Sequence, residues 1–484
     1  MMSLSDDEVF KDLLERREIG IFNLSDLNSE LRFEAEHFQK KYFELFDLLS
    51  NKKCELLDSL VLDEIKTGHT PSMKNQSFYG GSYHFIKTDN LRVNEIRDTF
   101  TDYLSKKGYD TLKQVHLKCG DIIVTIIGAT YDIIARCSLI GEEILPATIN
   151  QNIAMIRPDS IKIVPEYLVT YMNSKYGRMY LEYLARQMEQ VNLNCQEIGN
   201  FIVPILSIEF QNKIQHIVQQ AYRKLSDSKA KYKQVESDLI KEIGLDTFES
   251  SKEQISIRSL KDINNVGRID AEYYQPKYDD FQEHILNYKN GYTTPRQQFE
   301  QIKTKCKRNL KQYPYVEIGD INVATGESSF NFVSTDDLPE NAKIMTEKGD
   351  LLVSTVRPYR GAVSITKLDN LLVSGAFTVL RSKGAYPAQT LQVLLRTNLY
   401  KEWLLRYNVG TSYPVIKDDN ILDIPIPLFD QKTHKKIENS INMVQLLLQE
   451  SNQSFELAKH AVEIAIEKDE ASALHFIDKN IVTK

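Results

Sequence analysis

The chain repeats itself once along its length, and this duplication constrains the fold more than any single motif does. Ten residues near the start recur unchanged 236 positions later. They are Ile21, Leu24, Asp26, Asn28, Arg32, Ala35, Glu36, Gln39, Lys41 and Tyr42. Solenoid repeats have periods of about 20 to 50 residues, so this period is too long for a solenoid. The sequence therefore predicts two related globular domains, each followed by a connector.

Two further matches carry the repeat toward the end of each copy. Gly120-Asp121-Ile122-Ile123-Val124 corresponds to Gly349-Asp350-Leu351-Leu352-Val353, and Pro204 corresponds to Pro427. The number of positions between matching residues of the two copies falls along the chain, which indicates that the second copy is a few residues shorter. We expect a first globular domain over residues 1–206, a long helix over 207–246, a second globular domain over 247–428, and a second long helix with a C-terminal tail over 429–484.

Both connectors carry apolar or small residues at alternating spacings of four and three. The first seam is Ile214, Val218, Ala221, Leu225, Ser228, Tyr232, Val235 and Leu239. The second is Ile437, Ile441, Val444, Leu448, Ser451, Phe455, Ala458 and Val462. This spacing is typical of coiled coils, and two equal seams joined by a folded domain pair most simply as antiparallel helices of roughly 54 Å. The alternative is that each helix packs separately on its own domain.

The globular copies show short apolar runs bounded by Gly, Pro, Asn and Asp, followed by helical stretches near 165–186 and 388–406. This pattern predicts two α+β domains with mostly antiparallel sheets. The longest uncharged apolar run, Ile122 to Tyr131, is too short to cross a bilayer, and the N-terminus is acidic, so we expect a cytoplasmic protein. Five scattered cysteines support neither a disulfide framework nor a zinc ribbon.

Motifs that would indicate an enzyme are missing. The chain has no phosphate-binding loop, no G-x-G-x-x-G turn, no H-E-x-x-H helix and no Pro-Pro dipeptide. Asp58 with Glu64-Ile65-Lys66 loosely resembles a nuclease metal site, but the second copy lacks it, and a solvated charged turn explains it equally well. We therefore expect no catalytic residue and no metal site, and keep a nuclease, a methylating enzyme and a protein-only scaffold as alternatives.

Turns rich in hydroxyl, amide, aromatic and basic side chains instead suggest a nucleic-acid surface, because such groups suit base edges and phosphates. In the first copy the candidates are Thr70, Ser72, Lys74, Gln76, Tyr79, Tyr83 and Lys87. In the second copy they are Lys307, Arg308, Tyr313, Arg357, Tyr359 and Arg360. The lysines before Tyr313 could equally form a solvated loop. The net charge of −7 predicts weak DNA binding by the chain alone, with partners contributing to affinity.

Four features, present in order in both halves, resemble the specificity (S) subunits of type I restriction-modification systems. They are Arg32-x-x-Ala35-Glu36 with Arg268-Ile269-Asp270-Ala271-Glu272, the Gly-Asp-aliphatic-aliphatic-Val segments, the Ile-Pro-rich exits at Ile202–Leu206 and Ile424–Leu428, and the long helices that follow. Each motif is loose, but their repeated order is specific. The resemblance covers nearly the full length.

The resemblance implies a non-catalytic subunit that binds double-stranded DNA. In that family each globular domain reads one half of a split, asymmetric site, and the helix pair sets the spacer. Two methyltransferase (modification) subunits dock on it and link it to restriction and translocase subunits. S-adenosylmethionine, ATP and Mg²⁺ are then expected on the partners and no cofactor in this chain.

The resemblance also places several segments near DNA. In the first copy they are the turn at Thr70 and Ser72, the segment from Lys87 to Leu91, and Asn150 with Gln151. In the second copy they are Tyr315 to Ile321 and the segment containing Ser412 and Tyr413. The second copy lacks the Gly-x-Thr-Pro-Ser turn, so we expect the two domains to read different sequences.

Overall fold

The computed structural model describes residues 35–98, 100–128, 133–187, 191–253, 255–410 and 413–481. The chain divides into two compact units: unit 1 comprises the chain up to Lys224 together with Gln449–Lys484, and unit 2 comprises Leu225–Leu448. Among the described residues, no helix is both long and apolar enough to cross a membrane.

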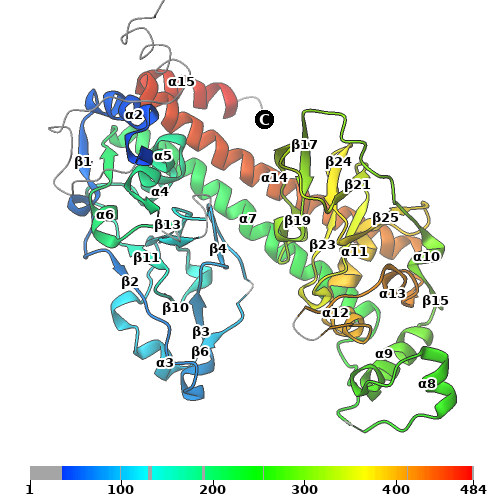
Figure 1. The fold of residues 1–484 in the computed structure, drawn as a ribbon. Coiled ribbons are helices and arrows are strands. Elements are labelled where there is room, and N and C mark those ends of the chain that lie inside the picture. The colour runs from blue at the N-terminus through cyan, green and yellow to red at the C-terminus, as the bar shows by residue number, and fades with distance from the viewer. Residues whose placement is uncertain are drawn as a thin grey trace, which may run out of the picture. The chain divides into compact units, whose positions relative to one another are not determined.

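Unit 1 combines helices with several small sheets (Figure 1). Its helices are α2 (Lys40–Ser50), α3 (Lys106–Asp110), α4 (Pro165–Asn173), α5 (Lys175–Leu184), α6 (Cys195–Gly199), the first half of α7 (Ile208–Glu242), the second half of α14 (Gln431–Glu467) and α15 (Glu470–Ile481). Its strands are β1 (Cys54–Leu56), β2 (Lys66–Thr67), β3 (Tyr79–Ile86), β4 (Leu91–Arg92), β5 (Glu95–Ile96), β6 (Tyr103–Leu104), β7 (Ile122–Thr125), β8 (Ile127–Gly128), β9 (Cys137–Leu139), β10 (Ala147–Ile149), β11 (Ile153–Ile156), β12 (Arg186–Gln187), β13 (Val191–Asn192) and β14 (Ile202–Pro204).

Unit 2 is built from corresponding elements. Its helices are α8 (Leu260–Val266), α9 (Pro276–Leu286), α10 (Pro295–Gln298), α11 (Ala388–Arg396), α12 (Asn398–Leu405) and α13 (Asp418–Leu422), with the remaining halves of α7 and α14. Its strands are β15 (Tyr292–Thr293), β16 (Phe299–Gln301), β17 (Gln312–Val316), β18 (Ile321–Asn322), β19 (Glu327–Ser328), β20 (Asn331–Ser334), β21 (Ala342–Thr346), β22 (Leu351–Ser354), β23 (Val363–Ile365), β24 (Leu371–Ser374), β25 (Phe377–Ser382) and β26 (Ile426–Pro427).

The two units share one topology, which confirms the α+β duplication predicted from sequence. The central sheets have strand orders β2-β11-β7-β9 and β16-β25-β22-β23, and all their pairings are antiparallel. A second sheet in each unit contains one parallel pair, β3 with β10 and β17 with β24. Two short hairpins, β4–β5 and β18–β19, also correspond.

The repeated aliphatic segment is an inner strand of each central sheet. In unit 1, Ile122 and Val124 pack into the core shared with α4, α5 and α7, whereas Ile123 packs into the core beneath β3 and β10. The middle strand of unit 2 alternates in the same way, since Leu352 packs into a different core from its neighbour Val353. A strand buried on both faces requires a continuous aliphatic run, which explains why this motif recurs.

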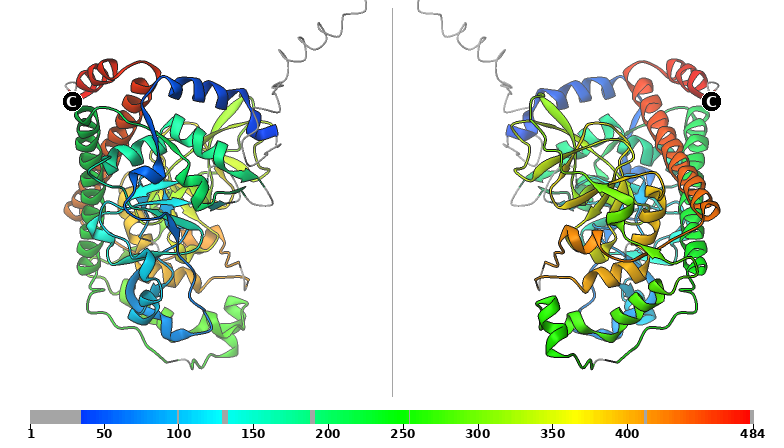
Figure 2. Two further views of the ribbon diagram at one scale, coloured as in Figure 1. Left: turned by 90° about the vertical axis from the view of Figure 1, so that its left-hand side faces the viewer. Right: turned by 90° about the vertical axis from the view of Figure 1, so that its right-hand side faces the viewer.

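The long helices α7 and α14 pair antiparallel within each unit and lie side by side in Figure 1 and Figure 2. In unit 1, Ser451 Oγ donates to the Ala221 carbonyl at 2.8 Å, and Lys224 pairs with Glu450 at 3.1 Å. In unit 2, Lys436 pairs with Asp238 at 2.7 Å. The antiparallel pairing predicted from the heptad spacing is therefore confirmed.

The predicted seam residues are buried, with the exception of Leu225, which is half-buried. Buried members are Ile214, Val218, Tyr232, Leu239, Ile437, Ile441, Leu448, Phe455 and Val462. The seam is continuous with the core of each unit, because its buried apolar residues belong to the same hydrophobic clusters as those of the sheets and short helices. In unit 1, Tyr222 Oη of α7 also accepts from the Leu139 N–H at 3.3 Å. The helices therefore pack on each other and also on the globular parts, so the alternative of two separately packed helices is wrong.

The chain after α14 forms a helix that the sequence reading treated as a tail. Asp469 accepts from the Ser472 N–H at 2.7 Å, which begins α15, and Ala473 and Ile477 are buried in the core of unit 1. Glu470 accepts from the Ser207 N–H at 3.0 Å, so α15 also contacts the start of α7.

His434, on the first turn of α14, gives unit 2 a pH-dependent stability. The side chain is buried, its Nδ1 lies 3.1 Å from Thr390 Oγ1, and Tyr386 and Phe429 pack against the ring. Burial lowers the pKa of His434 below its usual 6.5, against a weaker opposite effect of Asp430. The unfolded chain then binds the proton more readily, so stability is full above about pH 6.5 and falls as the pH drops below it.

We expect His434→Gln to remove this part of the pH dependence, because unit 1 carries Gln211 at the corresponding position. Unfolding by urea at pH 5, 6 and 7.5, monitored by hydrogen exchange of the unit 2 amides, measures the stability of unit 2 at each pH. An equal loss of stability on acidification in the wild-type protein and in the variant would contradict the assignment.

Candidate nucleic-acid interface

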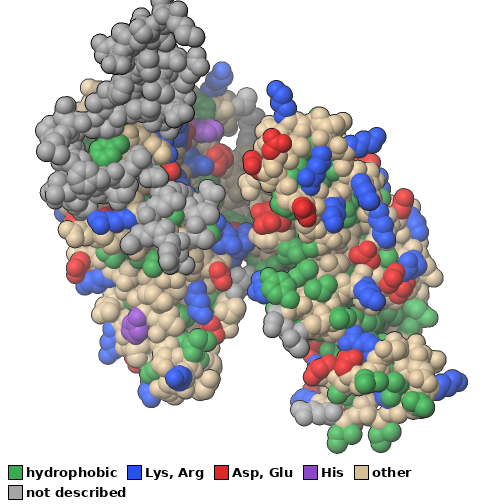
Figure 3. All heavy atoms as spheres, in the orientation of Figure 1, with side chains coloured by type: hydrophobic (Ala, Val, Ile, Leu, Met, Phe, Trp, Pro, Cys, Tyr) green, Lys and Arg blue, Asp and Glu red, His purple; other side chains and the backbone are tan. Residues whose placement is uncertain are grey.

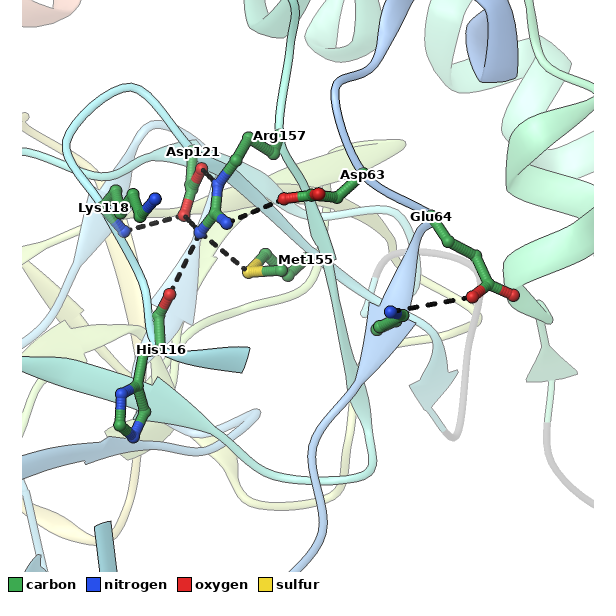
Figure 4. A network of polar contacts seen from close by, with 8 residues as sticks. Asp63, Glu64, His116, Lys118, Asp121, Met155 and Arg157 are labelled. Carbon is green, nitrogen blue, oxygen red and sulfur yellow. Dashed lines mark hydrogen bonds and ion pairs between the residues drawn. The ribbon is translucent and has the colours of Figure 1, made fainter. Parts of the chain in front are cut away.

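An ion pair between the buried Asp121 and the partly exposed Arg157 joins the adjacent ends of β7 and β11 in unit 1 (Figure 4). Arg157, directly after β11, donates Nε–H and Nη2–H to the two carboxylate oxygens of Asp121, both at 2.8 Å. The same guanidinium reaches Asp63 at 3.0 Å and the His116 carbonyl at 3.0 Å. Its hydrogen bonds to Asp121 raise the pKa of Arg157. All these partners lie within unit 1, so we interpret the cluster as one that stabilises the fold.

Unit 2 repeats the ion pair. Arg381 in β25 donates to the two oxygens of Asp350 at 2.7 and 2.9 Å, and also pairs with Glu347 at 2.8 Å. The glycines before the two aspartates, Gly120 and Gly349, have φ of 88° and 94°, a backbone region that favours glycine. The Gly-Asp repeat in the sequence therefore marks the start of a strand with an Arg–Asp anchor.

The residues of the suggested nuclease fragment are arranged as exposed charges. Glu64 lies 3.7 Å from Lys66, with both side chains exposed to solvent, and Asp58 is exposed as well. Over the described ranges, no three His, Cys, Asp or Glu side chains are placed to hold a metal ion.

The structure gathers one group of the predicted residues of unit 1 around the Gly68 turn. Thr70 Oγ1 donates to Gln151 Oε1 at 2.7 Å, and Tyr79 Oη donates to the Pro71 carbonyl at 2.6 Å. A Cβ on Gly68 would lie 1.8 Å from the Ile149 carbonyl oxygen, so this close approach requires glycine. Three further predicted residues lie on this turn or just after it: Ser72, Lys74 and Gln76, all exposed.

Three of the predicted DNA contacts in unit 1 are used inside the protein instead. Asn150 is buried, and its Oδ1 accepts from the Asn152 N–H at 3.1 Å, so it shapes a turn. Lys87 forms an ion pair with Asp102 and lies over the Phe85 ring. Tyr83 stacks on Tyr109 with ring centroids 4.4 Å apart and stays half-buried.

Two of the predicted residues in unit 2 likewise have partners within the protein. Tyr313 is only 1% exposed, because its ring faces the core of the sheet and its hydroxyl donates to Asn309 at 3.1 Å. Arg308 donates to the Pro339 carbonyl at 2.7 Å and holds the loop after β20 in place. Lys307, which precedes Arg308 in the chain, remains exposed.

The second group of predicted residues forms a single surface in unit 2, where two loops meet. Arg357 precedes a 3₁₀ helix, Pro358–Arg360, that closely follows β22 and has Arg360 as its last residue; Tyr359 and Arg360 are exposed. The Arg357 guanidinium lies 4.1 Å from the centre of the Tyr413 ring, which is 61% exposed. Arg357 also donates its backbone N–H to the Pro414 carbonyl at 2.7 Å.

Backbone pairing holds both ends of the second of these loops, which we call the Tyr413 loop (described residues 408–410 and 413–416). Val409 donates to Val415 at 2.9 Å, and Ile416 donates to Thr355 at 2.9 Å. Asn408, which sequence reasoning missed, closes the loop with its side chain: its amide donates to Gly410 and its Oδ1 accepts from the Val415 N–H. Ser412, another predicted contact, lies outside the described residues.

The corresponding place in unit 1 is the connection between β12 and β13. There β13 pairs with both β12 and β8, as Val415 pairs with both Val409 and Val356 in unit 2. The backbone pairings beside these two connections therefore correspond, while the sequences of the connections differ; residues 188–190 lie outside the described residues. On the face of unit 2 drawn in Figure 3, Lys and Arg side chains alternate with Asp and Glu.

Comparison with known proteins gives one curated relative. The specificity subunit of the type I restriction enzyme EcoBI from Escherichia coli is 30% identical over 137 residues, which span 27% of this chain and 28% of that protein. No protein-family model matches the chain.

Two solved structures align over most of the chain at low sequence identity. The S subunit of a type I restriction-modification system from M. genitalium has a TM-score of 0.37 and 12% identity, and covers 88% of this chain and 96% of its own. The HsdS subunit from Thermoanaerobacter tengcongensis has a TM-score of 0.29 and 13% identity, and covers 86% of this chain and 97% of its own. The match to the E. coli protein confirms the resemblance seen in the sequence: over the matched segment, this chain is similar to a type I restriction enzyme specificity subunit.

Proposed function

We propose that this protein is the DNA-recognition subunit of a type I restriction-modification complex. Each unit reads one half of an asymmetric, split DNA site, and the chain itself carries no catalytic residue. The observation that carries the proposal is the duplicated topology with different side chains at the same loop position, as Arg357 and Tyr413 illustrate in unit 2. Two copies of one fold whose proposed base-contacting loops differ in sequence can recognise two different half-sites.

The proposed partners are double-stranded DNA, two methyltransferase (modification) subunits and, through these, restriction and translocase subunits in the cytoplasm. S-adenosylmethionine, ATP and Mg²⁺ belong to those partners in this proposal. Phosphate neutralisation supplies much of the affinity of DNA-binding proteins. Because the net charge of this chain is −7, we expect the partner subunits to contribute part of the affinity for DNA. The paired helices α7 and α14 set the spacer between the half-sites.

Removing the two arginines beside the Tyr413 loop tests the proposed reading surface. An arginine that donates to guanine O6 and N7 contributes about 1–3 kcal/mol of base discrimination. We expect Arg357→Ala with Arg360→Ala to lower discrimination by roughly 5- to 150-fold in one half-site, and to leave the other half-site unchanged. Competition binding with single-base variants of the site, using the complex with modification subunits, measures this.

Arg296→Ala serves as the matched control, because Arg296 is an exposed arginine of the same unit that is held by Asp419 and Asp423. Unchanged discrimination in the Arg357/Arg360 double variant would remove these residues from the reading surface. Absence of any sequence preference in the wild-type complex would favour the alternative of a protein scaffold.

A further inference from the structure

Arg268, in the motif that opens the second copy, contacts the base of the Tyr413 loop. Its Nη2–H donates to the Asn408 carbonyl at 2.9 Å. The same guanidinium donates to both carboxylate oxygens of Asp270, at 2.8 and 2.6 Å, which raises the pKa of Arg268 and lowers that of Asp270. A planar guanidinium can make these bonds at once because its five N–H groups lie in a fixed fork.

The rest of the motif holds Arg268 in this position. Tyr274 Oη donates to the Arg268 carbonyl at 2.9 Å, and the guanidinium lies over the Tyr273 ring at 4.9 Å. Arg406, at the end of α12, donates to the Tyr273 carbonyl at 3.2 Å, and its guanidinium lies over the same ring at 4.7 Å. The segment therefore joins the start of the second copy to the point where α12 ends and the Tyr413 loop begins.

Asn408 is the residue on which the loop depends. Its carbonyl accepts from Arg268, its Oδ1 accepts from the Val415 N–H at 3.0 Å, and its amide donates to the Gly410 carbonyl at 2.9 Å. Val415 and Pro414 in turn pair with the chain around Arg357. A displacement of Asn408 thus changes the place of Tyr413 and of the arginine that stacks on it.

We propose that Arg268 is a positioning residue: it clamps Asn408 and so sets the Tyr413 loop against Arg357. The consequence for DNA reading rests on the proposed function, whereas the clamp itself can be measured without DNA. The proposal also gives a physical reason for the Arg-x-x-Ala-Glu repeat. Arg32, its counterpart 236 positions earlier, lies outside the described residues.

Hydrogen exchange of the full chain without DNA tests the clamp. In Arg268→Ala we expect the amides of Val409 and Val415 to exchange on the order of 10-fold faster, because both donate within the neck of the loop. Arg268→Lys keeps the charge but loses the fork, so we expect an intermediate rate. Lys277→Ala is the control: it removes a cation paired with Glu402 of α12 at 2.8 Å, away from the loop.

Unchanged exchange at Val409 and Val415 in Arg268→Ala, or an equal rise in Lys277→Ala, overturns the clamp. The same variants are then compared in the half-site discrimination assay, where Arg268→Ala should lower base discrimination in the half-site that depends on Arg357 and leave the other half-site unchanged. Faster exchange in Arg268→Ala alone, in a complex that lacks sequence preference even as wild type, supports the clamp and refutes the proposed function.

Discussion

Replacing Asp121 by alanine is expected to destabilise unit 1 by about 3 kcal/mol, the lower end of the cost of removing one partner of a buried ion pair, because Arg157 is 15% exposed and keeps Asp63. Asp121 is 1% exposed, and its carboxylate accepts two hydrogen bonds from Arg157 and one from the Lys118 N–H at 2.7 Å. Without it, the Lys118 N–H loses its partner, and the guanidinium loses two hydrogen bonds at the start of β7 and keeps only those to Asp63 and the His116 carbonyl. The whole central sheet of unit 1 depends on that strand.

Hydrogen exchange under mild denaturant measures this loss separately in the two units. The amides of β7 and β11 should lose protection in Asp121→Ala, while those of β22 and β25 keep theirs. Asp350→Ala is the matched variant and should give the reverse pattern, because it removes the same anchor from Arg381. Equal loss of protection in both units after either change would show that the anchors do not act locally.

Introducing a charge into the helix seam is the second large effect that we expect. Leu448 on α14 is 3% exposed and packs in the core of unit 2 with Ile441 and Val444, whereas Leu446 on the same helix is 46% exposed. Leu448→Glu removes a buried leucine, which alone costs about 2–5 kcal/mol, and also buries a carboxylate. Leu446→Glu should have little effect on stability.

The functional consequence follows from the proposed role of the helix pair. In the complex, Leu448→Glu should relax the preferred spacing between the half-sites before it alters the bases read in either one. Methylation of a library of sites with varied spacers measures this, with Leu446→Glu as the control. A spacer preference that stays as narrow as in the wild-type protein would contradict the role of α7 and α14 in setting it.

The helix pair and the duplication were predictable because packing leaves a period in the sequence. Buried residues recur every three or four positions along α7 and α14, and the aliphatic run at Ile122 recurs at Leu351 because both strands are covered on two faces. The Arg–Asp anchors were not predictable in the same way. Arg157 follows Asp121 by 36 positions, and no local spacing connects a strand's start to the end of its neighbour.

The candidate site was predictable only in part, because residue type does not show which way a side chain faces. Tyr313 and Pro314 are neighbours in β17, yet Tyr313 is buried in the core and Pro314 is not. Arg308, Lys87 and Asn150 have the chemistry to contact DNA, but each is held by a partner within its own unit. The turn at Arg357 was found because strand, arginine and proline are close together in the sequence, while Asn408 left no such pattern.

The central claim is that each globular domain reads its own half of a DNA site. Its most direct test is to purify this protein with a type I modification subunit and to map adenine methylation on genomic DNA with S-adenosylmethionine. The same mapping is repeated after residues 60–205 are exchanged for those of a related subunit. The account predicts a split, asymmetric motif in which one half changes and the other half and its spacer do not. A palindromic motif, or a motif that the exchange leaves unchanged, would contradict it.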